Sequence, residues 1–466
     1  MKKITISPLV PTELDHGFIP AALWNREYRN AVKANSEKVG IVIALERSNG
    51  AVSTYATSIF PHTEEFAPVN FKYVESIVKF LLWMKGGYRV TIAGCDKLAA
   101  ELKNTYSPTG ERSFDVEFMG NRIYGHPFEI VAKPLSQAPA QSEPQVKLGG
   151  YTDGCRVGFD LGGSDRKCAA VMNGEVIHTE EVVWDPYFQK DPEYHVAGIR
   201  DSIRRAAEKL PRVDAIGGSS AGVFVDNSPR VASLFRGLSK EDFDSKIAGL
   251  FHEIQKDYGV PLVVANDGEV TALAGSISLS SDSVLGLSMG TSTAAGYVNS
   301  NGNITDWLNE LAFAPVDYRD DAPIDEWSGA RGCGAQYFSQ QGVARLAKLA
   351  NINFPDDMPL PKRLEEIQTM MSNNDPRAEL IYKTIGICFG YTIAHYSDFY
   401  KIKKLLILGR VTSGRGGEII IEESRKVLEK EFPSLAKTIE LRVPDEKFKR
   451  HGQAVIAAGL SEIPKS

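Results

Sequence analysis

The chain has 466 residues, enough for two or three domains with buried cores. Hydrophobic residues make up 43% of it and charged residues 24%, which is typical of a water-soluble globular protein. The net charge of −6 at pH 7 argues against a nucleic-acid-binding surface, and no apolar run is long enough to span a membrane. These values favour an enzyme or binding protein with small-molecule ligands.

The five cysteines are odd in number and scattered, without a C-x-x-C pair: Cys95, Cys155, Cys168, Cys333 and Cys388. This pattern predicts reduced thiols and argues against both a disulfide framework and a four-cysteine zinc site. Residues 1–10 lack the apolar core of a signal peptide. We therefore expect a cytoplasmic protein.

Residues 1–133 are expected to form a small α/β domain of unknown role. The turn Ser48-Asn49-Gly50 joins two strand-like runs within 40–60, which is a strong hairpin signal. Apolar spacing and chain breaks then predict a helix over 72–85, a strand over 88–93, a helix over 96–106, and strands over 114–118 and 128–132. Residues 1–35 show no clear pattern.

The segment 134–150 contains three prolines and no hydrophobic periodicity, which predicts a linker. We place the linker at 134–152 and a second part of the protein at 153–466. In this second part, strand-like and helical segments alternate, which is typical of α/β folds.

The second part is organised around the stretch VGFDLGGSDRK at 157–167. An apolar strand ends in Asp160, and Gly162-Gly163 and Ser164 follow at once. Glycines let backbone N–H groups approach phosphate oxygens, and a carboxylate at a strand end can hold Mg²⁺, usually through water. An ordinary tight turn would explain the same residues.

Three further strand ends deliver polar or glycine residues: Asn266-Asp267, Gly290–Thr293 and Gly409–Gly417. Ligands bind beyond the carboxyl ends of strands in open α/β sheets, so these segments are expected to meet at one cleft. Such a cleft suits phosphoryl transfer, with Asp267 as the base that takes a proton from the attacking hydroxyl. Asn-Asp-Gly is also a common turn or helix cap. Two glycine-bearing hairpins, each opening an α/β half, indicate an internal duplication.

In order and spacing these segments resemble the ROK-type sugar kinases of the actin-like ATPase and sugar kinase superfamily. The resemblance covers about 156–460 and rests on the ordered set rather than on any single motif. The similar runs are FDLGGSDRKCAAV, VVANDGEVTALAG, LGLSMGTSTAAGYV, NELAFAPVD, GARGCGAQYFSQQGV, LLILGRVTSGRGG and HGQAVIAAGL. It implies two duplicated actin-like ATPase (ribonuclease H-like) lobes around a cleft, in addition to the small N-terminal α/β domain.

The resemblance also implies roles for individual residues, with ATP and Mg²⁺ as cofactors. Asp267 would be the catalytic base, and Asn266 and Glu310 would bind other hydroxyls of a sugar-like substrate. The nucleotide would lie on Gly162, Gly163, Gly290, Thr291, Gly409, Gly416 and Gly417. From the strand-end pattern itself, Asp160 is the candidate for holding Mg²⁺ through water, and Ser164 is a further candidate for contact with the cofactor.

Several positions depart from the family pattern. The metal-ligand histidine expected after Glu310 is absent from the run Glu310–Phe313, and Cys333 is the one cysteine of its cluster. A lone thiol cannot build a tetrahedral zinc site, so we predict no zinc. A second acidic sugar contact is lost at Gly334-Ala335, where Gln336 is the substitute. Ser292–Ala295 stand where the family prefers glycines. Their side chains are expected to narrow the space available to the nucleotide phosphates.

Two interpretations follow. In the first, the protein is a sugar kinase with an altered substrate. Arg236 and Arg331 would then suit an anionic sugar. Alternatively, these two residues are ordinary surface arginines. In the second, it is a ligand-binding or sensing module with weak or no turnover. Retention of Asp160, Asp267 and the glycine pairs favours the kinase. The absence of a helix-turn-helix pattern argues against a DNA-binding repressor. The sequence does not decide whether the protein forms a homodimer. It also does not decide whether residues 1–133 cover the mouth of the cleft.

Overall fold

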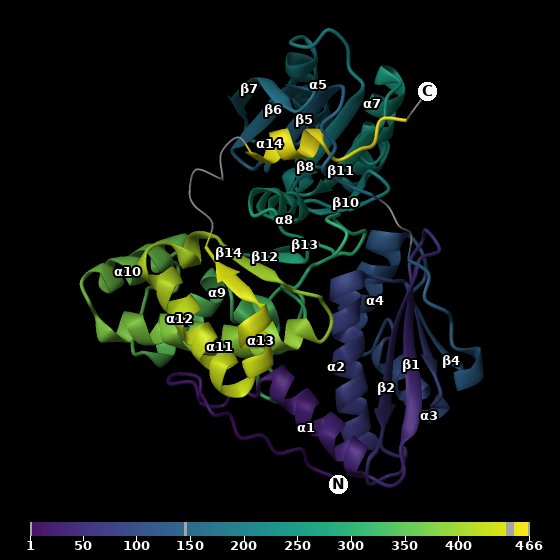
Figure 1. The fold of residues 1–466 in the computed structure, drawn as a ribbon, viewed down its shortest axis with the longest axis vertical. Helices are drawn as coiled ribbons and strands as arrows, with labels where there is room; N and C mark the ends of the chain where they lie inside the picture. Colours follow the sequence, from purple (N-terminus) through teal and green to yellow (C-terminus); the bar gives the residue numbers. More distant parts are fainter. Residues whose placement is uncertain (1, 144–146, 444–451, 465–466) are drawn as a thin grey trace.

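The computed structural model describes residues 2–143, 147–443 and 452–464, which form two α/β lobes and an N-terminal α/β domain (Figure 1). Lobe 1 lies at the top of the view, lobe 2 at the lower left, and the N-terminal domain at the lower right. Within the described ranges, no helix combines the length and the apolar character needed to cross a membrane.

Lobe 1 is built on a five-stranded sheet in the order β11-β8-β5-β6-β7. The first three strands, β5, β6 and β7, form an antiparallel meander. Strands β8 and β11 then add in parallel on the other side of β5. The strands are β5 (Cys155–Leu161), β6 (Asp165–Met172), β7 (Glu175–Val183), β8 (Ala215–Ser220) and β11 (Leu262–Asn266). The helices α5 (Pro192–Ala207) and α7 (Leu250–Tyr258) cover this sheet, with Ile199, Ile203, Phe251 and Ile254 in its core.

Lobe 2 repeats this plan with the sheet order β13-β12-β14-β15. Again an antiparallel hairpin comes first, and two parallel strands are added beside its first strand. The strands are β12 (Val284–Met289), β13 (Thr293–Val298), β14 (Lys404–Leu408) and β15 (Glu440–Arg442). The predicted duplication of actin-like ATPase lobes is therefore confirmed.

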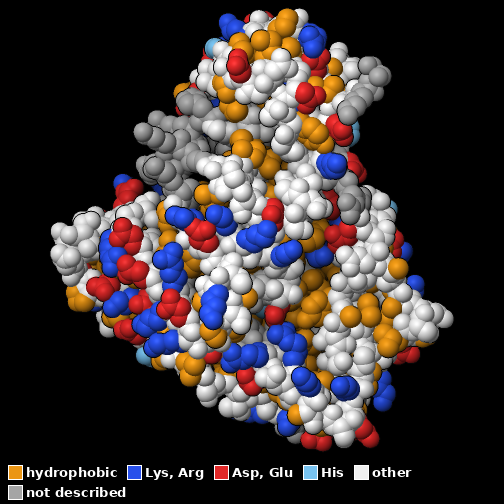
Figure 2. Space-filling view, viewed as in Figure 1, with side chains coloured by type: hydrophobic (Ala, Val, Ile, Leu, Met, Phe, Trp, Pro, Cys, Tyr) orange, Lys and Arg blue, Asp and Glu red, His pale blue; other side chains and the backbone are white. Residues whose placement is uncertain are grey.

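The helices of lobe 2 are α9 (Gln340–Leu349), α10 (Leu360–Ser372), α11 (Pro376–Ser397), α12 (Arg415–Glu431) and α13 (Pro433–Thr438). Asp375 caps α11 by accepting a hydrogen bond from the N–H of Arg377. On the face seen in Figure 2, basic and acidic side chains are interspersed over lobe 2. Helix α12 carries the ion pairs Arg415–Glu422 and Lys426–Glu423.

Two helices join the lobes. Helix α8 (Asp267–Ser278) leads from β11 of lobe 1 to β12 of lobe 2, and α14 (Gly452–Ala458) returns to lobe 1 (Figure 1). Helix α14 packs on strands that carry glycines because nothing larger fits: a Cβ atom at Gly158 would lie 1.8 Å from the Ala454 oxygen, and one at Gly217 would lie 1.7 Å from the Ala457 oxygen. The buried Arg156 then donates to the carbonyl of Ser461 at 2.7 Å and fixes the end of this helix.

The N-terminal domain has a mixed sheet in the order β2-β1-β3-β4. Its elements are β1 (Val39–Glu46), β2 (Val52–Ile59), α2 (Ala67–Lys85), β3 (Arg89–Ala93), α3 (Asp96–Thr105) and β4 (Glu129–Lys133). The hairpin at Ser48–Gly50 forms as predicted, and α2 begins five residues earlier than the predicted 72.

The predicted strand over 114–118 is wrong. This segment is helix α4 (Ser113–Glu117), which continues into a π-helical turn over Phe118–Tyr124. Phe114 and Phe118 are four residues apart, so a helix places both rings on one face. Their centroids lie 5.3 Å apart, and the Phe118 ring is 5.2 Å from that of Trp83. The spacing of the apolar residues was compatible with both a strand and a helix. Contact with α2 decides for the helix.

Residues 9–32 run across lobe 2, although they showed no pattern in the sequence. Helix α1 (Ala21–Ala34) packs on α11, and the N–H of Ala21 donates to the Val316 carbonyl at 3.0 Å. One cluster of buried side chains runs from this helix through the N-terminal sheet into lobe 2, whereas lobe 1 has its own cluster. The predicted boundaries at 133 and 153 stay a prediction. Residues 144–146 of the predicted linker lie outside the described residues.

The packing of α14 leads to a test of stability. The Gly158→Ala variant should lose at least about 1–3 kcal/mol of stability, because its new methyl group overlaps the Ala454 carbonyl. Gly249→Ala is the matched control, since a Cβ atom there would meet nothing within 4 Å. Urea unfolding followed by circular dichroism compares the two midpoints. Equal midpoints would show that α14 does not depend on this contact.

Candidate active site

The first turn of α8 is held at the boundary of the two lobes. Asn266 ends β11 and caps the helix, accepting from the N–H of Gly268 at 2.8 Å while its Nδ2 donates to the Gly222 carbonyl at 2.7 Å. Gly268 lies directly against β13, where a Cβ atom at Gly296 would be 2.1 Å from the Gly268 oxygen. Asp267, the first residue of α8, is therefore fixed between the lobe 1 sheet and the lobe 2 hairpin.

Three predicted carboxylates from different elements meet around this turn. Burial raises the pKa of Asp267 to about 6, and the charge of Asp160 at the end of β5 adds to the effect. Burial and the charge of Asp267 raise the pKa of Glu310 to about 7. Burial also raises the pKa of Asp160, although the ammonium group of Lys167 lies 3.7 Å from its Oδ2. Asp160 and Glu310 thus each lie near enough to Asp267 to interact with it electrostatically, while the roles predicted for the three residues stay predictions.

A first cavity, of about 430 Å³, opens on one side of α8. Asp267, Gly268 and Thr271 line it from the helix, Ala294 from the hairpin, and Gly409 from the end of β14. A Cβ atom at Gly409, whose φ is +99°, would lie 2.4 Å from the Met289 oxygen. A side chain there would separate β14 from β12, so the predicted nucleotide residue Gly409 also has a structural reason to be glycine.

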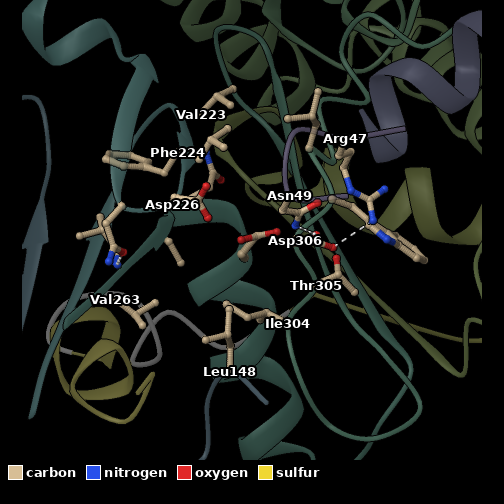
Figure 3. A pocket seen from close by; sticks show the side chains of 18 of the residues that line it. Arg47, Asn49, Leu148, Val223, Phe224, Asp226, Val263, Ile304, Thr305 and Asp306 are labelled. Carbon is tan, nitrogen blue, oxygen red and sulfur yellow. Dashed lines mark hydrogen bonds and ion pairs between the residues drawn. The ribbon is translucent and has the colours of Figure 1, made fainter. Parts of the chain in front are cut away.

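A second cavity, of about 290 Å³, lies on the other side of the same helix turn (Figure 3). Asn266 and Glu269 line it from the helix. Two further walls are the segment 222–227 of lobe 1, which contains the short strand β9 (Val223–Val225), and the segment 304–308 of lobe 2. The turn 47–49 of the N-terminal domain forms another wall. Asp267 and Asn266 thus face different cavities across one helix turn.

The predicted phosphate turns lie apart from the described linings of both cavities. The N–H of Gly162 donates to the Asp165 carbonyl at 3.0 Å, and the Tyr187 hydroxyl packs where a Cβ atom of Gly163 would be. Ser164 is exposed beside them. In the second turn, Gly290 donates to the Ser292 carbonyl at 2.9 Å and Thr291 is exposed.

The residues that replace family glycines in the second turn take different directions. The hydroxyl of Thr293 is buried and donates to the Phe338 carbonyl at 3.0 Å, so this side chain is directed away from the turn. Ala295 is buried in the core and Ser292 is exposed. Ala294 alone of these residues is among the described residues that line the first cavity.

Other predicted residues are engaged elsewhere. Gly416 and Gly417 lie in the first turn of α12. A Cβ atom at Gly416 would lie 2.4 Å from the Tyr382 ring, and one at Gly417 would lie 2.1 Å from the Thr412 carbonyl oxygen. The Gln336 amide donates to Gln341 at 2.7 Å. Cys333 is buried among alanines, and burial raises the pKa of its thiol to about 12. Within the described part of the chain, no group of three His, Cys, Asp or Glu side chains could hold a metal ion.

The two arginines considered for an anionic sugar are placed differently. The guanidinium group of Arg236 stacks 3.9 Å from the centroid of the Tyr187 ring, and Arg331 is exposed. Neither is found among the described residues that line the two cavities.

A buried hydrogen-bond network beside the site was not predicted from the sequence. Asn309 Nδ2 donates to Glu269 at 3.2 Å, and the Tyr400 hydroxyl donates to the Asn309 Oδ1 at 2.8 Å. Burial is the main reason that the pKa of Glu269 rises to about 8. The spacing of Glu269 three residues after Asn266 was the available signal, since it places both on one helix face. Its partners come from distant segments that no local pattern links to it.

The N-terminal domain supports this network directly. The N–H groups of Asn309 and Glu310 donate to the carbonyls of Met84 and Trp83, both at 2.9 Å, in the last turn of α2. Asn309 has a φ of +52°, a left-handed conformation that asparagine tolerates better than most residues. The loop that carries Glu310 is therefore fixed by residues outside the two lobes.

The two lobes, each a hairpin followed by parallel strands and both facing one cleft, define an actin-like ATPase fold. The chain belongs to the ROK family, whose model matches residues 156–433. The ROK hexokinase from Thermus thermophilus is similar in fold, with a TM-score of 0.51 and 18% identity over 65% of this chain and 97% of that chain.

Two other solved structures are similar at lower scores. A ROK family transcriptional regulator, a homolog of the E. coli MLC protein, has a TM-score of 0.49 and 19% identity over 65% of this chain and 77% of that chain. A ROK family glucokinase from Streptomyces griseus, in complex with glucose and AMPPNP, has a TM-score of 0.45 and 20% identity over 65% of this chain and 99% of that chain. Comparison with curated proteins gives no match.

The buried Glu269 makes stability depend on pH. Its folded pKa of about 8 lies above the ordinary value of 4.5, so the folded state holds the proton more tightly and stability falls as pH rises through this window. The Glu269→Gln variant mimics the protonated acid. It should gain stability relative to the wild type between about pH 4.5 and 8, on the order of 1.4 kcal/mol for each unit of pKa displacement.

Melting temperatures measured from pH 5 to pH 9 would show this gain. The exposed Glu175→Gln variant is the control and should keep a constant difference from the wild type. A difference between Glu269→Gln and wild type that does not change with pH would contradict the assignment.

Proposed function

We propose that the protein is an ATP- and Mg²⁺-dependent kinase that phosphorylates a hydroxyl of a sugar or sugar-like acceptor. One observation carries this proposal: the first turn of α8 lies between two cavities, with Asp267 on the first and Asn266 on the second. A phosphoryl-transfer enzyme needs a base at the junction between donor and acceptor. The first cavity would take the nucleotide and the second the acceptor.

Asp267 would act as the general base. Its pKa of about 6 leaves it largely ionised at pH 7, yet more basic than an ordinary aspartate, which favours proton abstraction. Burial of Glu310, whose pKa is about 7, leaves part of its population protonated, so it can donate to or accept from an acceptor hydroxyl. The capping hydrogen bonds of Asn266 keep its amide in one orientation beside the acceptor.

Asp160 offers a carboxylate close to the base, since its charge raises the pKa of Asp267. Mg²⁺ keeps several of its waters and can bind a protein through as few as one or two carboxylates, so Asp160 fits this role without a larger cluster of acidic residues. Asp160 would hold Mg²⁺, which supplies charge neutralisation for the nucleotide phosphates. Gly409 would contact the nucleotide, and Gly163, Ser164 and Thr291 would offer N–H groups to the phosphates.

A binding module with little turnover is the second candidate. The N–H groups of Gly162 and Gly290 are hydrogen-bonded within their own turns, which favours it. A nucleotide would need to displace those bonds or bind to neighbouring N–H groups. The raised pKa of Asp267 has no evident use in a module that only binds, and this supports the kinase.

Replacement of the base separates the two candidates. The Asp267→Asn variant should lower kcat roughly 10²–10⁴-fold while nucleotide binding is retained, because the amide cannot accept the proton. The exposed Asp185→Asn variant is the control. ATP consumption with a panel of neutral, amino and acidic sugars measures the effect. Full turnover in Asp267→Asn would remove this residue from its role, and nucleotide binding without wild-type turnover would favour the binding module.

The pH dependence of the wild type provides a second test. As pH falls through about 6, Asp267 becomes protonated and cannot act as a base, so kcat/KM should drop about tenfold per unit below that value. A rate profile between pH 5 and pH 8 would show it. A profile that is flat over this range would contradict the assignment of Asp267.

A further inference from the structure

The second cavity has a wall that the two lobes do not supply. The turn between β1 and β2 of the N-terminal domain places Arg47, Ser48 and Asn49 at its edge (Figure 3). Opposite them lie Val223, Phe224 and Asp226 from lobe 1, and Thr305 and Asp306 complete the wall on the lobe 2 side. The cavity therefore needs all three parts of the protein.

Polar contacts fix this turn to lobe 2. Asn49 Nδ2 donates to Asp306 at 3.0 Å, and the Nη2 of Arg47 lies 3.4 Å from the same carboxylate. Arg47 also donates to the Ser53 hydroxyl at 2.9 Å. The Asn49 side chain accepts from the N–H of Ala51, which holds the turn itself in shape. The wall is thus preorganised, which lowers the entropic cost of binding a ligand against it.

Two polar groups in the wall are buried without a hydrogen-bond partner among the described residues. They are the Nε of Arg47, a side chain only 2% exposed, and the hydroxyl of Thr305. Buried polar groups are nearly always satisfied, so two unsatisfied groups on residues of the cavity lining indicate a missing partner that a polar ligand can supply. Glu269 adds a carboxyl group to the lining of the cavity from the first turn of α8.

The charge and the apolar part of the lining restrict the class of ligand. The positive charge of Arg47 is already taken up by Asp306, and Asp226 carries a further negative charge, so an anionic group would be repelled. Tyr124, Phe224 and Trp307 contribute aromatic surface. Aromatic surface with a few placed polar groups is typical of small-molecule pockets, and here it suits an uncharged, hydroxyl-rich group.

We propose that the turn 47–49 and Thr305 bind an uncharged, hydroxyl-rich part of the acceptor that extends beyond the ring being phosphorylated, such as a second sugar ring. This inference rests on the proposed function for the position of the first ring beside Asn266. The N-terminal domain then sets the length and the charge of the acceptor. Monosaccharides would bind without using this wall.

Two variants test the wall without disturbing its contacts. Ser48 is exposed and lines the cavity, so Ser48→Trp would fill the outer space. Thr305→Val keeps the shape and removes the unpartnered hydroxyl, which should leave stability equal or higher. Ser36→Trp is the matched control, because Ser36 is an exposed serine of the same domain.

Binding of monosaccharides, neutral disaccharides and acidic sugars is measured by calorimetry, and phosphoryl transfer is measured in parallel. A neutral disaccharide should bind about tenfold or more tightly than its monosaccharide, and both variants should remove most of that advantage. The KM for ATP and the affinity for the monosaccharide should not change. Ser36→Trp should behave as the wild type.

The outcomes distinguish this inference from the proposed function. A disaccharide preference that Ser48→Trp removes, with no turnover in the wild type, would keep the inference and reject the kinase. Turnover on a monosaccharide, with no longer neutral ligand preferred, would keep the kinase and overturn the inference. Disaccharide binding that both variants leave unchanged, preference for an acidic sugar, or no binding by any panel member would also overturn it.

Discussion

The contact between Gly268 and Gly296 is the constraint on which the site depends. With no side chain on either residue, the first turn of α8 lies against the backbone of β13, so lobe 1 and lobe 2 meet at backbone distance. The cap from Asn266 fixes the same turn to the loop at Gly222. Because the catalytic candidate Asp267 lies between these two contacts, its position follows from backbone packing rather than from flexible side-chain bonds.

Charge is the second organising factor. The fold brings the carboxyl groups of Asp160, Asp267, Glu269 and Glu310 into a partly or wholly buried region, and burial raises the pKa of each. Such an arrangement costs stability at neutral pH. A structure retains groups of this kind where function needs them, and perturbed pKa values cluster at functional sites. The duplicated fold of the two lobes and the raised pKa values therefore support the same location for chemistry.

The N-terminal domain is part of this arrangement and not an appendage. Its core is continuous with that of lobe 2, and the last turn of α2 accepts hydrogen bonds from the loop that carries Glu310. Its hairpin turn lines the second cavity, where Asn49 donates a hydrogen bond to Asp306 of lobe 2. A change in this domain would therefore act on the second cavity, while the described lining of the first cavity comes from the lobes alone.

The sequence by itself determined the hairpin at Asn49-Gly50 and the strand ends near Asp160 and at Asn266, because turn chemistry and periodicity are local. The roles predicted for individual site residues stay predictions. Only the tertiary structure decided that 114–118 is helical, that Gly416 and Gly417 pack against neighbours, and that Glu269, Asn309 and Tyr400 form one network. Each of these depends on side chains from distant segments, which no local pattern encodes.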